Sequence, residues 1–372
     1  MRRSPLKSTY DIISFDFAKA FEKAPHWAIV RALIDHGIRG APLMWFISFL
    51  RGRTQQVRVG ESYSSIVDVI SGVVQGTVVG PGLYTVFVDS LFRKIRLPSI
   101  GYADDFKFIA DVVLYSTADV QHDINTIVQW SDDNYTPLSI EKCGVLHCGA
   151  EQPNRVYYIK GSVLKSVDNF KDLGVVRSTA ANHTGHYQAH YQQVAAKAAQ
   201  VSGSIRRIFR SRSRELLWPA FQIYVLPLLM QCSPVWNPAL KRDISVLESV
   251  QRRYTSCISG LKGLSYSDRL KELGALTLEK RRTFADMVTV YKFMHNGVNC
   301  SAADVGLTFR NTNTRGGHNQ LEQPIVQRAF DSYFCYRVPS VWNKLKPHIV
   351  SATSLRSFKK FLLTSLLQQY GQ

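Results

Sequence analysis

The sequence lacks paired cysteines and long apolar runs. Its six cysteines are scattered over 372 residues without a Cys-x-x-Cys pair, which argues against a disulfide scaffold or a zinc knuckle. Reduced thiols in an intracellular protein are the better interpretation. The most apolar stretch, residues 216–230, is interrupted by Pro219 and Pro227 and is too short to span a bilayer. The basic N-terminus precedes no sustained apolar run, so we expect no signal peptide and no membrane partner.

Acidic residues are scarce in the second part of the chain. Residues 1–150 carry 15 Lys+Arg and 15 Asp+Glu, whereas residues 151–372 carry 31 against 13, which accounts for the whole net charge of +18. A charge distribution of this kind predicts a polyanionic partner, most plausibly nucleic acid. The alternative is a soluble basic surface without a specific partner. The hydrophobic content of 45% is enough for a core, and the length suggests two or three domains.

Three carboxylates lie in or beside apolar segments of the first part. Asp16 lies in the apolar segment 11–17, while Asp104 and Asp105 separate the apolar segments 100–102 and 106–110. Antiparallel strands lie about 4.8 Å apart, so a sheet can bring these carboxylates together. Such a group can hold two Mg²⁺ ions, or Mn²⁺, for joining nucleotides. Alternatively, Asp104 and Asp105 merely form a turn and Asp16 caps a helix.

Local patterns predict the elements around these carboxylates. Apolar segments indicate strands at 11–17, 100–102, 106–110 and 143–147, and alternation indicates a hairpin formed by 55–59 and 65–70. Helices are expected at 27–36, 42–50, 81–91 and 117–130, the last with Thr117 as its N-cap. Further short strands are expected at 156–159 and 170–176, and the pattern becomes helical after about residue 180. This order predicts the α+β class, an antiparallel sheet with packed helices, rather than a parallel α/β sheet.

A glycine-rich segment, SGVVQGTVVGP at residues 71–81, precedes the helix expected from Pro81. Its glycines allow the backbone to approach a ligand closely. Gln75 can hydrogen-bond to an incoming nucleotide or in the minor groove. Taken alone, many such strand-to-helix turns are purely structural.

Together these segments resemble the palm of a reverse transcriptase. Residues 15–26 (FDFAKAFEKAPH), 71–81 and 102–105 (YADD) look like three successive palm motifs in the right order. The resemblance is to non-LTR retrotransposons of the jockey and LINE type. It continues through Lys142 and through residues 170–175 (FKDLGV), which are similar to the family's primer-grip strand. The segments 233–238, 247–253 and 337–343 also resemble the family. It implies a palm over 1–150, primer-grip-like strands over 151–178, a thumb-like helical region over 179–240 and a basic helical C-terminal region over 241–372.

The resemblance implies a role for each matched position. Asp16, Asp104 and Asp105 would be the ligands of two metal ions. Lys142 would approach the triphosphate and act as a general acid for pyrophosphate. The remaining matched residues would contact the nucleotide: Phe21 would exclude a 2′-hydroxyl, and Gln75 and Gly76 would bind the incoming dNTP. Without the resemblance, Phe21 would be interpreted as a core aromatic and Lys142 as a solvated lysine.

The implied activity is RNA-directed DNA polymerisation onto a primer 3′-hydroxyl, with an RNA template, a DNA primer and dNTPs as partners. The resemblance also implies target-primed reverse transcription and a nuclear site of action. The basic helical part would follow the phosphates of the template–primer duplex through Arg206, Arg207, Arg210, Arg252 and Arg253. For the last two, the alternative is the solvated face of an ordinary packed helix.

The sequence departs from the family pattern at three positions and in its extent. Glu22 stands where Asp is usual, Val74 where Pro is usual and Thr77 where Ser is usual. Only 15 residues precede Asp16, so we expect a polymerase truncated at its N-terminus, without its fingers and endonuclease portions. The alternative hypothesis is a catalytically inactive truncated or domesticated remnant that binds nucleic acid. A metal-dependent nuclease is a weaker third hypothesis, since no residue stands out as a water-activating base.

Overall fold

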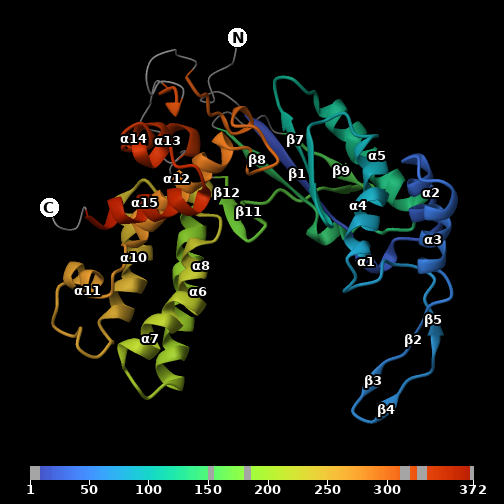
Figure 1. Ribbon diagram of the computed structural model, residues 1–372. Coiled ribbons are helices and arrows are strands. Elements are labelled where there is room, and N and C mark those ends of the chain that lie inside the picture. The colour runs from blue at the N-terminus through green and yellow to red at the C-terminus, as the bar shows by residue number, and fades with distance from the viewer. Residues whose placement is uncertain (1–8, 150–154, 180–185, 311–318, 325–332, 369–372) are drawn as a thin grey trace. The chain divides into compact units, whose positions relative to one another are not determined.

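A computed structural model describes residues 9–149, 155–179, 186–310, 319–324 and 333–368 (Figure 1). The chain divides into two compact units, residues 1–169 and 170–372, and each is described by itself. The finer division into palm, primer grip, thumb and C-terminal region stays a prediction.

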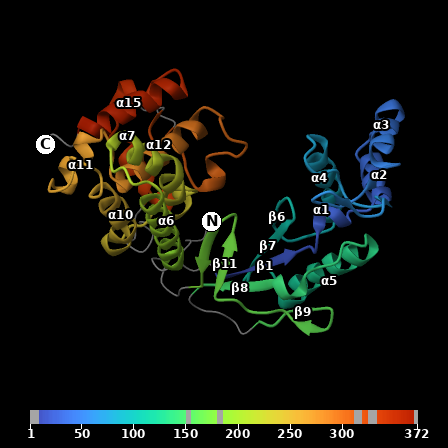
Figure 2. The same cartoon turned by 90° about the horizontal axis from the view of Figure 1, so that it is seen from below.

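A four-stranded antiparallel sheet forms the centre of the first unit. Its order is β6 (Ser99–Tyr102), β7 (Asp105–Asp111), β1 (Tyr10–Asp16) and β8 (Gly144–Cys148). The first segment of the chain therefore lies between β7 and β8, as Figure 2 shows. The antiparallel sheet and its packed helices confirm the α+β class, and they bring segments about 90 residues apart onto neighbouring strands.

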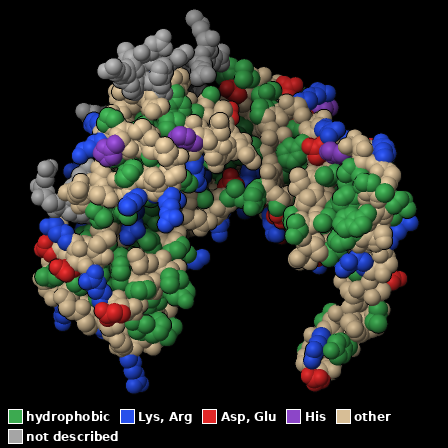
Figure 3. Space-filling view, viewed as in Figure 1, with side chains coloured by type: hydrophobic (Ala, Val, Ile, Leu, Met, Phe, Trp, Pro, Cys, Tyr) green, Lys and Arg blue, Asp and Glu red, His purple; other side chains and the backbone are tan. Residues whose placement is uncertain are grey.

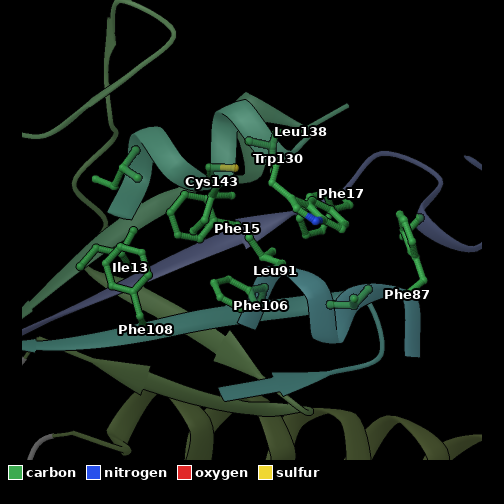
Figure 4. Close-up of a cluster of buried hydrophobic side chains, with 14 of the residues drawn as sticks. Ile13, Phe15, Phe17, Phe87, Leu91, Phe106, Phe108, Trp130, Leu138 and Cys143 are labelled. Atoms are coloured by element: carbon green, nitrogen blue, oxygen red, sulfur yellow. The ribbon is translucent and has the colours of Figure 1, made fainter. Parts of the chain in front are cut away.

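One face of this sheet is buried under two helices, α4 (Val79–Phe92) and α5 (Thr117–Asp133). Ile13 and Phe15 of β1 are fully buried there beside Phe106 and Phe108 of β7 (Figure 4). Trp130 of α5 closes this core against α4, with its ring 5.0 Å from that of Phe87. Because side chains alternate along a strand, Asp16 lies on the opposite face from Phe15.

Helix α5 starts as predicted, but its N-cap is Ser116 rather than Thr117. The Asp119 N–H donates to the Ser116 hydroxyl at 3.2 Å, and the Ser116 N–H donates to the Asp119 carboxylate at 2.9 Å. Such a reciprocal pair needs an acidic or amide residue three positions after the cap. Asp119 meets that spacing from Ser116 and not from Thr117.

Two helices and an exposed arm connect β1 to α4. After a short helix α1 (Ala20–Lys23) come α2 (His26–Asp35) and α3 (Gly40–Leu50). Helix α3 carries no charged residue, and Leu50 is the one residue of the helix that is buried. Met44 and Trp45 are 62% and 53% exposed, and Figure 3 shows hydrophobic side chains gathered over α2 and α3.

The arm is the predicted hairpin, interrupted in the middle. β2 (Thr54–Gln55) pairs with β5 (Val67–Asp68), and nearer the tip β3 (Arg58–Val59) pairs with β4 (Ser62–Tyr63). Figure 1 shows this arm projecting from the unit. A two-stranded ribbon without a second layer cannot bury its side chains, which is why its apolar residues stay exposed.

The remaining strands form two small hairpins. β9 (Tyr158–Ile159) pairs with β10 (Ser162–Val163) near α5. The strand expected over 170–176 is instead a hairpin of β11 (Asn169–Asp172) and β12 (Val175–Ser178). Its two turn residues, Leu173 and Gly174, have φ values of 44° and 87°, a conformation that breaks a continuous strand.

The second unit is helical, as the sequence predicts. Its elements are α6 (Gln188–Ile208), α7 (Arg214–Ala220), the π-turn η3 (Phe221–Val225), α8 (Leu226–Met230), α9 (Ser233–Trp236), α10 (Lys241–Thr255), α11 (Tyr266–Glu272), α12 (Leu278–Met294), α13 (Phe334–Trp342), α14 (Pro347–Val350) and α15 (Leu355–Gln368), with a 3₁₀ turn η4 (Ala303–Val305) after α12. One core lies among α6, α7 and α10, and another among α12, α13 and α15. Among the described residues, each helix is too short or too polar to cross a membrane.

Four polar side chains from α9 to α13 form a buried ionic network in this unit. Arg337 donates two hydrogen bonds of 2.9 Å to the Asp286 carboxylate. Asn237 donates to the same carboxylate at 3.0 Å and accepts from Arg282 at 2.9 Å. The Asp286 charge is thus compensated in place, and segments that are about 100 residues apart in sequence are held together.

A buried histidine makes the second unit sensitive to acid. His190 of α6 is 3% exposed, accepts a hydrogen bond from the Val176 N–H and packs edge-on against Trp236. Burial lowers the pKa of His190 from 6.5 to about 4. The unfolded chain therefore takes up the proton first as the pH falls, so stability is complete above about pH 6.5 and declines towards pH 4.

We expect urea unfolding of the chain to give a free energy about 2 kcal/mol smaller at pH 5 than at pH 7 from this group alone. The matched variant His190→Gln keeps an acceptor for the Val176 N–H but does not titrate. Between pH 7 and pH 5, the unfolding free energy of this variant should fall by about 2 kcal/mol less than that of the parent. Parallel pH profiles for the two proteins would contradict the assignment.

Candidate active site and nucleic-acid surface

The sheet register places two of the three predicted carboxylates directly opposite each other. Asp16 at the end of β1 pairs with Asp105 at the start of β7. Directly opposed residues point to the same face with Cβ atoms about 5 Å apart. This is the face opposite the core, and the two side chains are 31% and 43% exposed. Asp104 occupies the adjoining β6–β7 turn beside Ala103, whose φ is 54°.

Two lysines accompany the carboxylate pair. Lys142 Nζ lies 3.2 Å from Asp16 Oδ2, and Lys107 Nζ lies 3.9 Å from Asp105 Oδ1. Lys142 is held there by the 3₁₀ turn η2 (Ile140–Lys142), because the preceding Ser139 N–H donates to the Asp16 carbonyl at 2.8 Å. The structure thus brings Lys142 to Asp16 from 126 positions away in the sequence.

The carboxylate pair meets one requirement of a divalent-cation site, the number of carboxylates, but it does not form a complete set of ligands. Mg²⁺ commonly takes one or two protein carboxylates and completes its shell with water and substrate phosphates. Asp16 and Asp105 offer such a pair, and the two ammonium groups lie where positive charge is favoured. Among the described residues, however, no three His, Cys, Asp or Glu side chains converge closely enough to form a preassembled metal site.

Phe21 and Tyr84 form a stacked pair, and Tyr84 is near Asp104 of the β6–β7 turn. Their ring centroids are 4.3 Å apart with planes inclined by 24°. Burial, and after it the nearby Asp104 carboxylate, raise the pKa of the Tyr84 hydroxyl above its ordinary value of 10.0. Phe21 of α1 is therefore a partly buried aromatic at the edge of the core, stacked on a tyrosine whose hydroxyl is affected by the Asp104 carboxylate.

The glycine-rich segment is fastened to the chain that follows β1. The Gly72 N–H donates to the Ala24 carbonyl at 2.7 Å, and His26 Nε2 lies 2.9 Å from the Gly72 carbonyl. Gly72 has a φ of +89°, and a Cβ there would lie 2.8 Å from the Glu22 carbonyl oxygen. Glycine is required at this position because any side chain would both clash and strain the backbone.

Thr77 shapes the second half of the same segment. Its hydroxyl donates to the Val74 carbonyl at 2.7 Å and accepts from the Gly80 N–H at 3.1 Å. A serine would offer the same hydroxyl, which explains why threonine fits here. These bonds leave Gln75 and Gly76 exposed at the tip, and α4 begins at Val79, two residues before Pro81.

A cavity of about 540 Å³ adjoins Gln75. Its lining includes Glu22, Arg53 and Gln55, so the root of the arm contributes to it. Sequence reasoning missed Arg53 and Gln55. The local signal was the polar run Arg53-Thr54-Gln55-Gln56 at the start of an otherwise alternating hairpin.

Comparison with known proteins agrees with this geometry. Residues 4–177 match the family model described as reverse transcriptase (RNA-dependent DNA polymerase). Residues 4–177 are a reverse transcriptase domain. The family expected from the sequence is thereby confirmed.

The curated relatives of the chain include polymerases of non-LTR elements. The RNA-directed DNA polymerase from mobile element jockey of Drosophila melanogaster is 25% identical over 227 residues, which cover 57% of this chain and 24% of that protein. The Pol polyprotein from type-1 retrotransposable element R2 of Popillia japonica is 24% identical over 193 residues, covering 46% and 31%. The chain thus spans a quarter to a third of these relatives.

Among solved structures, an apo telomerase from Candida tropicalis is similar over 73% of this chain and 46% of its own, with 10% identity and a TM-score of 0.40. A likeness this loose says nothing about function.

Beyond the reverse transcriptase domain, the five predicted arginines are all exposed but do not share one surface. Arg206 of α6 and Arg253 of α10 line the same groove, a cavity of about 270 Å³ with the small residues Ala195 and Ala199 on its wall. Arg252, next in sequence, instead lies over the Tyr266 ring at 5.1 Å. Arg207 and Arg210 lie near the end of α6 outside that groove.

Proposed function

We propose that this chain catalyses RNA-directed DNA synthesis by transferring nucleotides onto a primer 3′-hydroxyl. The observation that carries the proposal is the β1–β7 register, which sets Asp16 against Asp105 on the face of the sheet opposite the core, beside the turn that holds Asp104. The reverse transcriptase domain supplies the family context.

The residues around this pair have distinct roles in the proposal. Two Mg²⁺ ions, or Mn²⁺, when bound would lower the pKa of the primer hydroxyl and neutralise the leaving pyrophosphate. Asp16, Asp104 and Asp105 would hold them. Lys142, poised 3.2 Å from Asp16, would move towards the triphosphate and give its proton to pyrophosphate.

The nucleotide would lie between the carboxylates and the glycine-rich segment. Phe21, held in place by its stack on Tyr84, would pack under the sugar and exclude a 2′-hydroxyl. Gln75 and Gly76 are exposed at the tip of their loop, where an incoming dNTP can be contacted.

The whole chain would bind the RNA template and DNA primer, with residues 1–150 as palm, 151–178 as primer grip, 179–240 as thumb and 241–372 as C-terminal region. Arg206 and Arg253 would grip phosphates from their common groove. The uncharged, exposed helix α3 would pack against the fingers portion of a longer polymerase. The site of action would be the nucleus.

The test is primer extension on an RNA template with dNTPs and Mg²⁺. We expect extension by the parent chain, none after chelation of the metal, and at least a tenfold loss for Asp104→Ala, since electrostatic groups of this kind contribute about 10²–10³-fold. Asp89→Ala is the matched control, because Asp89 is a surface carboxylate of α4 that pairs with His36 and Arg93.

The second candidate is a remnant that binds nucleic acid without polymerising. The lack of three converging ligands among the described residues favours it. If neither the parent nor Asp104→Ala extends the primer while both bind the duplex tightly, the polymerase proposal fails and the remnant is supported.

A further inference from the structure

The end of the chain carries charge of one sign. Residues 332–372 contain six Lys or Arg and no Asp or Glu. One of the six, Arg337, is 14% exposed and is paired with Asp286. The other five are exposed, and none of them forms an ion pair with another described residue: Lys344, Lys346, Arg356, Lys359 and Lys360. These five cations can therefore contact a polyanion of the kind that the charge distribution predicts.

Three of these cations share helix α15. Its buried residues, Phe358, Leu362 and Leu366, pack into the core of the unit, where the Phe358 ring stacks on Tyr291 at 4.4 Å. Arg356 is three and four residues from Lys359 and Lys360, so its charge lies about one helical turn from theirs and repels them. Figure 3 shows Lys and Arg side chains over α15. A bound polyanion would relieve that repulsion.

An exposed aromatic pair lies beside the last of these cations. Phe361 follows Lys360 directly and is 40% exposed, and its ring points about 100° around the helix from Lys360, away from Lys359. The His348 ring of α14 supports it edge-on, with centroids 5.8 Å apart and planes at 78°. An accessible aromatic face beside phosphate-binding cations is the combination on which unpaired bases stack.

The surroundings distinguish between polyanions. A bilayer would need an apolar side of α15 to insert, but that side is buried against the core of the unit. A duplex keeps its bases stacked inside and would leave Phe361 unused. A single strand can use both the cations and the ring.

We propose that Arg356, Lys359, Lys360 and Phe361, the α15 surface, bind single-stranded nucleic acid through its phosphates and one stacked base. This site is separate from the Arg206–Arg253 groove and does not rest on polymerase activity. The Asp104→Ala variant should therefore bind single strands as the parent does, whatever the outcome of primer extension.

The first test is fluorescence anisotropy with a labelled 20-nucleotide RNA of mixed sequence. The triple variant Arg356→Glu/Lys359→Glu/Lys360→Glu should bind at least about tenfold more weakly at 100 mM KCl, and its salt slope should fall by about 2, from three lost contacts to a single strand. The control Lys241→Glu/Lys262→Glu/Lys271→Glu changes the net charge equally at exposed positions and should stay within about threefold of the parent. Equal weakening by the two triple variants would overturn the proposal.

The second test isolates stacking. Phe361→Leu keeps an apolar side chain but removes the ring, and it should weaken binding of the single strand about tenfold while leaving binding of the same sequence as a duplex unchanged. Unchanged single-strand binding by Phe361→Leu would remove the stacked base from the proposal. If the triple variant loses binding to phosphatidylserine vesicles but keeps RNA binding, the surface is a membrane contact and the proposal is wrong. Thermal unfolding of each variant confirms that it is folded.

Discussion

Replacing Asp16 by Asn is expected to abolish primer extension without weakening the fold. The substitution keeps the size of the side chain and removes the charge that faces Asp105 and Lys142. We expect primer extension to fall on the order of 10³-fold, the upper end of the effect of removing one preorganised electrostatic group from an active site.

The unfolding temperature should stay unchanged or rise slightly. Two carboxylates set directly opposite each other on neighbouring strands repel, so neutralising one removes a repulsion that destabilises the sheet. The lost partner, Lys142, is 70% exposed and returns to water at little penalty. Extension rates and thermal unfolding by circular dichroism should be measured on the same preparations, with Asp89→Asn as control. A fall of several degrees for Asp16→Asn would show instead that the carboxylate is structural.

Replacing Arg337 by Ala is expected to destabilise the second unit strongly. The Asp286 carboxylate would then be buried with Asn237 and without its guanidinium partner. Breaking such a pair from one side typically lowers the free energy of unfolding by about 3–5 kcal/mol. Denaturant unfolding measures this change, and Arg356→Ala, at an exposed position of α15, should change stability by less than about 0.5 kcal/mol.

A double variant separates the buried charge from lost packing. Arg337→Met/Asp286→Leu removes both charges and keeps apolar volume, so it should be more stable than Arg337→Ala. If the double variant is less stable than the single one, the network contributes through its geometry and not through compensation of the Asp286 charge. A loss below about 1 kcal/mol for Arg337→Ala would contradict the whole account.

Local patterns were enough to find the strands and the glycine-rich segment but not their alignment. Buried apolar residues such as Phe15 and Phe106 mark their strands because the pattern lies within a few positions. Which carboxylate faces Asp16 depends on register, and a shift of one residue would have set Asp104 or Phe106 there. Register is fixed by packing of the whole sheet, so the pairing of Asp16 with Asp105 could not be read from the sequence.

The spatial partners of Arg252 and Arg253 could not be predicted from the sequence either. Arg252 and Arg253 are neighbours in sequence, but successive helical residues point about 100° apart. One therefore lies over Tyr266 and the other lines the groove with Arg206, 47 positions earlier. The partners of both come from other helices, whose packing no short window of sequence reveals.

Helix α3 has a practical consequence for anyone who handles this protein. Molecules with a net charge of +18 repel one another, and that repulsion keeps the uncharged helices, with their exposed Trp45 and Met44, out of mutual contact. Salt shortens the range of the repulsion to about 10 Å at 0.1 M while leaving the attraction between apolar surfaces intact. We therefore expect salt to have two opposite effects: the concentrations that suppress non-specific binding of polyanions are those at which self-association through α3 becomes favourable. Glycerol or a mild detergent, which mask α3 without screening charge, would separate the two effects.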